Sequence, residues 1–206
     1  MKYLTYKDMV GSMEGWEQKK FLVGGTSVRP GDALQKIITR LNARHIVEIG
    51  TGFGTSALAM AGCECVKSVK TFDIKDSIWP GYIARRFGLD HKINFIPAAD
   101  SYDIYRNIIL KGIYDLAFID GAHIPPYAEN DFNAVQHIGQ ALFDDAYSKH
   151  IRKILDDNGG IVIGKRFGYW NEAQEYTTLV DLDLANNDTI TADGKMHHDY
   201  RYLNNL

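Results

Sequence analysis

The sequence is poor in cysteine and proline, and neither sign of charge dominates it. Its 206 residues include only two cysteines, Cys63 and Cys65, which excludes a disulfide framework and a zinc site with four cysteine ligands. Its 23 Lys and Arg residues and 26 Asp and Glu residues give a formal net charge of -3, whereas nucleic-acid-binding domains are usually strongly basic. No apolar run approaches the roughly 20 residues of a membrane-spanning helix or forms the core of a signal peptide. We therefore expect a cytoplasmic protein without nucleic-acid or membrane partners.

Short apolar runs alternate with longer amphipathic segments along most of the chain. Such alternation predicts an α/β fold with a doubly wound, mostly parallel sheet, whose right-handed connections place helices on both faces. Between residues 128 and 155, apolar residues recur at three- and four-residue spacing, which predicts a helical segment that Asp144 and Asp145 could divide in two. The predicted strands span residues 44–50, 68–74, 93–98, 114–120 and 161–164, and the predicted helices span residues 33–42, 55–62, 78–88 and 101–112.

The most informative segment is VEIGTGFGTS, residues 47–56, in which three glycines lie between a predicted strand and a predicted helix. Glycines here let the backbone pass close to a ligand and expose amide N–H groups to it, although they could also form only a tight turn. The dinucleotide-binding pattern G-x-G-x-x-G would need glycine at position 55 or 57, and these positions hold Thr55 and Ala57. Because that pattern tolerates alanine, an NAD-dependent enzyme is a weak alternative.

Glu48, inside the predicted strand and two residues before Gly50, favours a different family. The stretch E-I-G-T-G-F-G-T resembles the first motif of class I S-adenosylmethionine (SAM)-dependent methyltransferases, and the spacing of the later segments resembles the small-molecule O-methyltransferases of that class. The resemblance extends from about Ser27 to Phe167. Residues 119–123 read IDGAH, which is most similar to the IDG-x-H loop of a family that includes macrolide and aminocoumarin sugar methyltransferases.

This resemblance implies that SAM is the cofactor and that its methionine part lies against residues 50–54. Glu48 would hold that loop or the SAM amino group, and Asp73 would accept hydrogen bonds from both ribose hydroxyls, unless it caps the next helix. Ile74 would lie against the adenine, whose edge Asp100 and Ser101 would contact. Ser101 is also the expected N-cap of the following helix. The residues that the resemblance assigns to the cofactor are Glu48, Gly50, Thr51, Gly52, Phe53, Gly54, Asp73, Ile74, Asp100, Ser101 and Asp120.

The catalytic candidates follow the fourth predicted strand. The resemblance places Asp120 beside the sulfonium of SAM, where metal-dependent relatives have an aspartate that binds a divalent ion and, three residues later, a lysine that acts as general base. This sequence has His123 at the spacing of that lysine. Histidine has an unperturbed pKa of about 6.5 and can take a proton from an acceptor hydroxyl at neutral pH. We expect His123 to be the base and Asp120 to orient it or the acceptor, unless His123 only caps the turn.

The rest of the metal site departs from the pattern of those relatives. They have an Asp-Asn pair just after the fifth strand, whereas the strand predicted at 161–164 is followed by Lys165 and Arg166. Two cations cannot ligate magnesium and would repel it. We therefore expect no catalytic metal, and Lys165 would supply a fixed positive charge that orients an anionic acceptor. The two side chains could instead be solvated cations beyond the end of the strand.

The length predicts a single methyltransferase domain, residues 1–206. We expect a helical extension or lid at residues 1–40, a cofactor-binding core at 44–167, and a C-terminal segment at 168–206 with an antiparallel hairpin around Asp193–Gly194. The expected activity is metal-independent methyl transfer from SAM to an oxygen of a small-molecule acceptor. A SAM- or nucleotide-binding regulatory protein without transferase activity is the alternative, and either protein could be a homo-oligomer.

Overall fold

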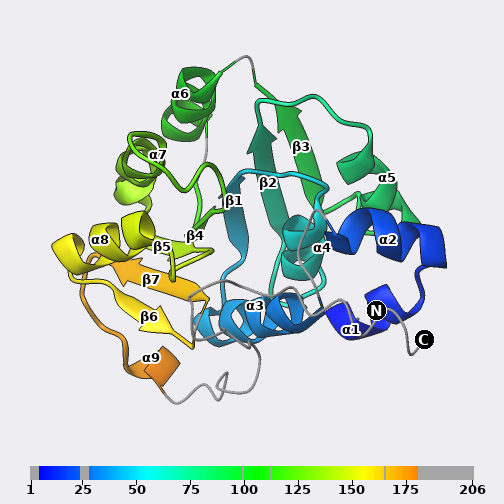
Figure 1. Ribbon diagram of the computed structural model, residues 1–206, viewed down its shortest axis with the longest axis horizontal. Coiled ribbons are helices and arrows are strands. Elements are labelled where there is room, and N and C mark those ends of the chain that lie inside the picture. Colours follow the sequence, from blue (N-terminus) through cyan, green and yellow to red (C-terminus); the bar gives the residue numbers. More distant parts are fainter. Residues whose placement is uncertain (1–4, 24–27, 99, 112, 165, 181–206) are drawn as a thin grey trace.

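The structure, a computed structural model, describes residues 5–23, 28–98, 100–111, 113–164 and 166–180. A seven-stranded sheet in the order β3-β2-β1-β4-β5-β7-β6 forms its centre (Figure 1). All pairs among β1 to β5 are parallel, whereas β7 is antiparallel to both β5 and β6. The predicted α/β fold with a doubly wound, mostly parallel sheet is therefore confirmed. The strands are β1 (His45–Ile49), β2 (Ser68–Asp73), β3 (Ile93–Pro97), β4 (Leu116–Ile119), β5 (Gln140–Phe143), β6 (Ile161–Ile163) and β7 (Phe167–Asn171).

Helices cover both faces of the sheet (Figure 1), and each face has its own apolar core. The helices on one face are α1 (Tyr6–Gly11), α2 (Gly15–Val23), α3 (Val28–Leu41), α4 (Thr55–Ala61), α5 (Trp79–Arg86) and α9 (Thr177–Val180). The helices on the other face are α6 (Ser101–Lys111), α7 (Tyr127–Val135), which continues into the 3-10 helix η1 (Gln136–Ile138), and α8 (Lys149–Asn158).

The central strand β4 is apolar throughout because both of its faces are buried. In β4, Leu116 and Phe118 pack into the core beneath α3 and α4, and Ala117 and Ile119 pack into the core beneath α6 and α7. Side chains of a strand point to alternate faces, so a strand covered on both sides needs apolar residues at every position. This pattern fixes β1 and β4 as neighbours at the middle of the sheet, where their carboxyl ends lie side by side.

The helical segment predicted for residues 128–155 is wrong in its middle. The chain leaves the helical conformation at Gly139, which has a φ of 81°, and forms strand β5 before α8 begins. Leu142 follows Ile138 at four-residue spacing, so this short, fully buried strand has the periodicity of a helix. β5 pairs with β4 and is the fifth parallel strand. The segment predicted as fifth, β6, lies at the edge of the sheet and, among the described strands, pairs with β7 alone.

Other sequence predictions concern the end of the chain. β7 was not predicted, and it forms an antiparallel pair with β6 in the described C-terminal part. The hairpin predicted around Asp193–Gly194 and the cation Lys165 lie outside the described residues.

The N-terminal helix α2 lies against the segment that follows β1. The rings of Phe21 and Phe53 are 6.1 Å apart, and Phe21 also contacts Trp79 at 5.8 Å. The hydroxyl of Tyr82 donates a hydrogen bond to Glu17 at 2.8 Å. These contacts connect α2 to the glycine-containing loop and to α5.

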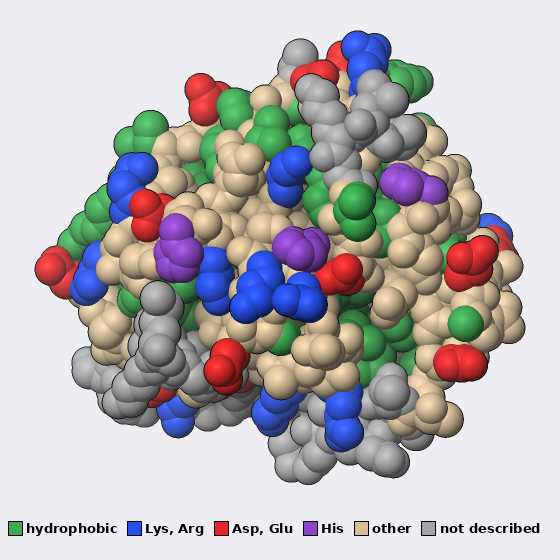
Figure 2. All heavy atoms as spheres, turned by 180° about the vertical axis from the view of Figure 1, so that it is seen from behind, with side chains coloured by type: hydrophobic (Ala, Val, Ile, Leu, Met, Phe, Trp, Pro, Cys, Tyr) green, Lys and Arg blue, Asp and Glu red, His purple; other side chains and the backbone are tan. Residues whose placement is uncertain are grey.

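The surface carries charges of both signs. On the face opposite to that of Figure 1, Lys and Arg side chains gather beside two histidines, with acidic side chains nearby (Figure 2). Within the described residues, no helix combines the length and apolar character that a membrane span requires.

Candidate active site

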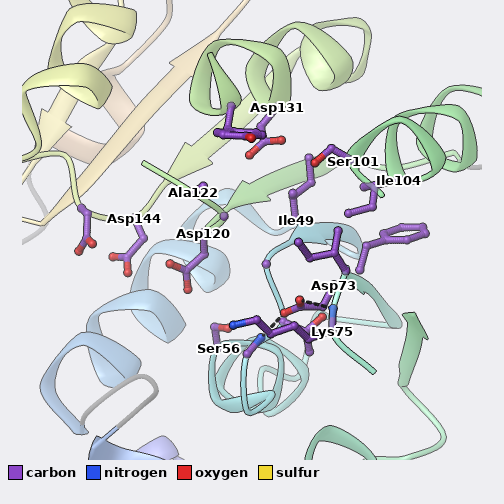
Figure 3. Close-up of a pocket in the computed structure, with 18 of the residues that line it drawn as sticks. Ile49, Ser56, Asp73, Lys75, Ser101, Ile104, Asp120, Ala122, Asp131 and Asp144 are labelled. Atoms are coloured by element: carbon purple, nitrogen blue, oxygen red, sulfur yellow. Dashed lines mark hydrogen bonds between the residues drawn. The ribbon is translucent and has the colours of Figure 1, made fainter. Parts of the chain in front are cut away.

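A cavity of about 680 Å³ opens at the carboxyl ends of β1, β2, β4 and β5 (Figure 3). Ligands of open α/β sheets bind at this edge, and the volume suits a nucleoside-sized ligand. Its walls come from the loops after these strands and from α6 and α7. The lining residues are Ile49, Gly50, Thr51, Gly52, Phe53, Thr55, Ser56, Phe72, Asp73, Ile74, Lys75, Ser101, Ile104, Asp120, Gly121, Ala122, Tyr127, Asp131, Asp144, Asp145, Tyr147 and Arg166.

The loop after β1 depends on glycine conformations. Gly50, Gly52 and Gly54 have φ angles of 95°, 51° and 82°, in the left-handed region that residues with a Cβ rarely adopt. At Gly50 a Cβ would also lie 2.2 Å from the carbonyl oxygen of Asp120, far inside contact distance. The loop after β1 therefore packs directly against the backbone after β4, and no residue other than glycine fits there.

Asp73, at the end of β2, closes the other side of this loop. Its Oδ2 accepts a hydrogen bond from the amide of Gly52 and its Oδ1 accepts one from the amide of Lys75, both at 2.9 Å (Figure 3). Asp73 does not cap the next helix, since the N-cap of α5 is Ile78. Each carboxylate oxygen has a second lone pair, so Asp73 can accept two further hydrogen bonds from a ligand in the cavity.

Glu48 lies beneath the loop and not in the cavity wall. It is fully buried, one of its oxygens accepts a hydrogen bond from the hydroxyl of Ser56, and Oε2 has no hydrogen-bond partner among the described residues. Burial raises the pKa of Glu48 to about 7, although the hydrogen bond from Ser56 opposes that shift. Glu48 thus holds the start of α4 against the end of β1, and its unpaired oxygen leaves a polar group for a water or ligand donor.

The other predicted cofactor residues divide into two groups. Gly54 and Asp100 are absent from the cavity wall. Asp100 is exposed and its Oδ1 accepts a hydrogen bond from the amide of Asp103 at 2.8 Å, so Asp100 is the N-cap of α6 and the prediction of Ser101 as the cap is wrong. The predicted residues that do line the cavity are Gly50, Thr51, Gly52, Phe53, Asp73, Ile74, Ser101 and Asp120.

Asp120 and His123 lie close together after β4. Nε2 of His123 is 3.9 Å from Oδ1 of Asp120, and Nδ1 of His123 is 3.0 Å from Oδ2 of Asp145. Asp120 lines the cavity, whereas His123 lies behind it, with Nε2 buried and without a hydrogen-bond partner among the described residues. If Nδ1 carries the proton that bonds Asp145, Nε2 presents its lone pair toward Asp120.

The charges around this pair shift its ionisation. Burial raises the pKa of Asp120 well above its usual range, and the neighbouring carboxylates Asp144 and Glu48 raise it further against the opposing charge of Arg166. Burial lowers the pKa of His123, but the hydrogen bond and charge of Asp145 outweigh burial and raise that pKa above 6.5. Both groups therefore hold a proton to a higher pH than an ordinary aspartate or histidine.

An acid pair follows the fifth parallel strand after all. Asp144 and Asp145 come directly after β5, where the sequence prediction had placed Lys165 and Arg166. Arg166 nevertheless reaches this point, because it precedes β7 and β7 pairs with β5. Its guanidinium donates two hydrogen bonds to the two oxygens of Asp144, and its Nη2 lies 3.6 Å from Oδ1 of Asp145. A buried guanidinium thus lies between the carboxylates at the end of β5.

This arrangement does not fit a divalent ion. Both oxygens of Asp144 are bonded to Arg166, and Oδ2 of Asp145 is bonded to His123. An ion would have to displace the guanidinium of Arg166, whose side chain is 10% exposed. In the part of the chain that the structure describes, no group of three or more His, Cys, Asp or Glu residues is placed to hold a metal ion.

Among the site residues that the sequence did not reveal are Asp131, Asp144, Asp145 and Tyr147. Asp144 and Asp145 had a usable signal, because they follow Gly139 and the short apolar run of β5. Asp131 and Tyr147 had none that the sequence could reveal. Asp131 bonds Tyr105 from the neighbouring helix, and Tyr147 interacts with Asp145 only because of the fold of that loop.

No family model matches the sequence, and no curated protein is similar to it in sequence. Solved structures are similar in fold. An O-methyltransferase from Bacillus cereus in complex with S-adenosylhomocysteine (SAH) has a TM-score of 0.63 and 17% identity, over 82% of this chain and 90% of that chain. TomG, a SAM-bound O-methyltransferase from Streptomyces achromogenes involved in tomaymycin synthesis, has a TM-score of 0.60 and 17% identity, over 78% and 87%. The SAH-bound methyltransferase PaMTH1 from Podospora anserina has a TM-score of 0.59 and 16% identity, over 79% and 86%. The chain therefore has the fold of these SAM-dependent methyltransferases.

Proposed function

We propose that this protein transfers a methyl group from SAM to an oxygen of a small-molecule acceptor. The observation that carries this proposal is the convergence of three features on one cavity: the glycine loop after β1, the carboxylate of Asp73 after β2, and the pair of Asp120 and His123 after β4. The structural neighbours that contain SAH or SAM support the same cofactor. Methyl transfer to oxygen needs the acceptor close to the sulfonium and a group that takes its proton.

Different residues of the cavity would contact the ribose, the methionine part and the adenine of SAM. When bound, SAM supplies an electrophilic methyl group on its sulfonium. Asp73 accepts hydrogen bonds from the ribose hydroxyls through the lone pairs that its two backbone bonds leave free. The backbone of residues 50–53 would lie against the methionine part, and Ile74 would cover one face of the adenine.

The proton of the acceptor hydroxyl goes to the pair of Asp120 and His123. Asp120 lines the cavity, where an acceptor hydroxyl can reach its carboxylate, and Nε2 of His123 is buried 3.9 Å from its Oδ1. Asp120 orients the hydroxyl and passes its proton to His123, and Asp145 fixes the ring of His123. Tyr127 and Tyr147 also line the cavity and give the acceptor a partly aromatic wall.

Arg166 takes the role that the sequence suggested for Lys165. Its buried charge lies next to Asp120, Asp144 and Asp145, where metal-dependent relatives would hold an ion, and it stabilises their negative charges without one. We expect the transfer to be independent of metal for this reason. A cytoplasmic location, a homo-oligomer and a lid function for residues 1–40 stay predictions from the sequence.

The alternative, a regulatory protein that binds SAM without transferring its methyl group, has the same cofactor site. Turnover of SAM to SAH with a panel of hydroxylated acceptors separates the two. One feature favours the transferase. Nε2 of His123 is buried without a hydrogen-bond partner among the described residues, and a protein that only binds SAM has no use for such an atom.

Replacing Asp73 with alanine should weaken SAH binding by about 1.5–3 kcal/mol, the usual contribution of hydrogen bonds to a charged group. Isothermal titration calorimetry measures this effect. Asp76→Ala is the matched control, because Asp76 is an exposed carboxylate three residues further on that does not line the cavity. If the folded wild-type protein bound neither SAM nor SAH, the proposed function would be wrong.

Removal of metal ions should leave turnover unchanged. Arg166 already occupies the carboxylate oxygens that an ion would need, so EDTA removes nothing that the reaction uses. Methyl transfer is measured after dialysis against EDTA and again after addition of magnesium or manganese. Activity that disappears and returns with the metal would show that the ion displaces Arg166 in the working enzyme.

A further inference from the structure

One carboxylate in the cavity has no function in the mechanism above. Asp131, on α7, is 4% exposed and lines the cavity. Its Oδ1 accepts a hydrogen bond from the hydroxyl of Tyr105 at 2.6 Å, whereas Oδ2 accepts none from the described residues. Since Asp131 lines the cavity and its Oδ2 has no donor among the described residues, this oxygen can accept a hydrogen bond from a ligand in the cavity.

The position of Asp131 indicates which part of the ligand supplies that donor. Oδ2 lies beside Gly121, where a Cβ would be only 2.8 Å away. Figure 3 shows Asp131 at the same end of the cavity as Ser101 and Ile49, away from Asp73 at the ribose end. Ile49 and Ile104 give this end apolar walls. A flat, apolar ring fits between these walls, and a hydrogen-bond donor on the edge of that ring can reach Oδ2 of Asp131.

We infer that Asp131 recognises the exocyclic amine of the cofactor's adenine and makes the site specific for a 6-aminopurine. The inference rests on the proposed cofactor and deepens it, because it assigns the base specificity to a residue that the sequence resemblance did not include. Asp100, which the resemblance placed at the adenine edge, is exposed and bonded to its own helix. Tyr105 holds Oδ1 and thereby directs Oδ2 toward the cavity.

The test compares two ligands that differ only at the base: SAH, and the same thioether with unsubstituted purine in place of adenine. The second ligand keeps the ring and lacks only the amine. Wild-type protein should bind SAH about tenfold more tightly or better, because loss of the donor leaves Oδ2 unpaired. Asp131→Asn keeps an oxygen for Tyr105 and turns an NH2 group toward the cavity, so its preference for SAH should fall to about threefold or less.

Tyr105→Phe is the matched control, because it removes the partner of Oδ1 and keeps the acceptor Oδ2. This variant should retain most of the preference for SAH, even if both ligands bind more weakly. Calorimetry gives both affinities and circular dichroism verifies folding. Equal binding of the two ligands by the wild-type protein would overturn the inference without any variant, as would an Asp131→Asn variant that is folded and keeps the wild-type preference.

Failure of the proposed function gives a different result. If the wild-type protein binds neither ligand, SAM is not its cofactor, and the inference about Asp131 is wrong as well. A protein that binds SAH with the expected preference and transfers no methyl group contradicts only the transferase proposal. The affinity ratio therefore tests the function of Asp131 separately from catalysis.

Discussion

His123→Ala is expected to lower turnover by about 10²–10⁴, the range that general-base catalysis usually contributes, while SAH affinity changes little. His123 lies behind Asp120 and outside the cavity wall, so its loss removes the proton acceptor and leaves the cofactor contacts in place. Single-turnover rates and calorimetry on the same preparation measure the two effects. His91→Ala is the control, since His91 is exposed and does not line the cavity.

The pH profile of the wild-type enzyme should support the same assignment. Only the neutral imidazole can accept a proton, and the pKa of His123 is raised, so the imidazole stays protonated to a higher pH than an ordinary histidine. Activity should therefore fall on the acid side with a midpoint above 6.5. Asp145 and Asp144 favour the protonated ring, whereas Arg166 and burial oppose it.

Other outcomes would give His123 a different function. If it only stabilises the turn, His123→Ala should lower the melting temperature and weaken cofactor and acceptor binding together. His123→Lys, which restores the residue of the metal-dependent relatives, should recover some rate only at high pH. A folded His123→Ala variant with normal SAH affinity and wild-type turnover would remove this residue from the mechanism and leave proximity and Arg166 as the explanation.

Arg166→Met should lower the free energy of unfolding by about 3–5 kcal/mol, because it leaves a buried carboxylate without its charge partner. The side chain of Asp144 is 4% exposed and both of its oxygens lose their donors. For a chain of this length the melting temperature should fall by about 6–20 °C. Lys153→Met provides the control, because its ion pair with Asp157 is exposed to solvent and should contribute little to stability.

The same variant should acquire a response to divalent ions. Asp120, Asp144 and Asp145 are not placed to hold an ion in the wild-type protein. Removing the guanidinium frees the oxygens of Asp144 and lets the three carboxylates draw together around magnesium or manganese, which prefer oxygen ligands. Manganese should raise the melting temperature of Arg166→Met and leave that of the wild type unchanged. Equal stabilisation of both proteins would mean that Arg166 does not exclude an ion from this site.

Much of the fold and of the cofactor site could be predicted because their signals are local. Each of β1 to β4 is a short run rich in apolar or β-branched residues. The residue that matters lies directly at the end of the strand: Gly50 after β1, Asp73 closing β2, and Asp120 after β4. In a parallel sheet these ends meet at one edge, so the order of the chain alone brings the three residues together.

The remainder of the site depends on pairs that distant elements bring together. Asp131 meets Tyr105 from another helix, and Arg166 meets Asp144 across 22 positions of the sequence. The sequence correctly predicted a positively charged side chain where metal-dependent enzymes hold a divalent ion, but the strand on which this prediction was based was the wrong one. The prediction relied on β6 as the fifth parallel strand, whereas Arg166 arrives there through the antiparallel strand β7, which the sequence did not reveal.

The contact of Gly50 with the carbonyl of Asp120 has a consequence for how variants of this protein are interpreted. A side chain at position 50 would have to push the peptide after Asp120 away by more than an ångström, as judged from the 2.2 Å that a Cβ would leave. Such a variant would bind cofactor poorly and also react slowly, although residue 50 supplies no functional group to either step. Assays would record two defects with a single steric origin, and neither measurement alone would identify Gly50 as a spacer between two loops.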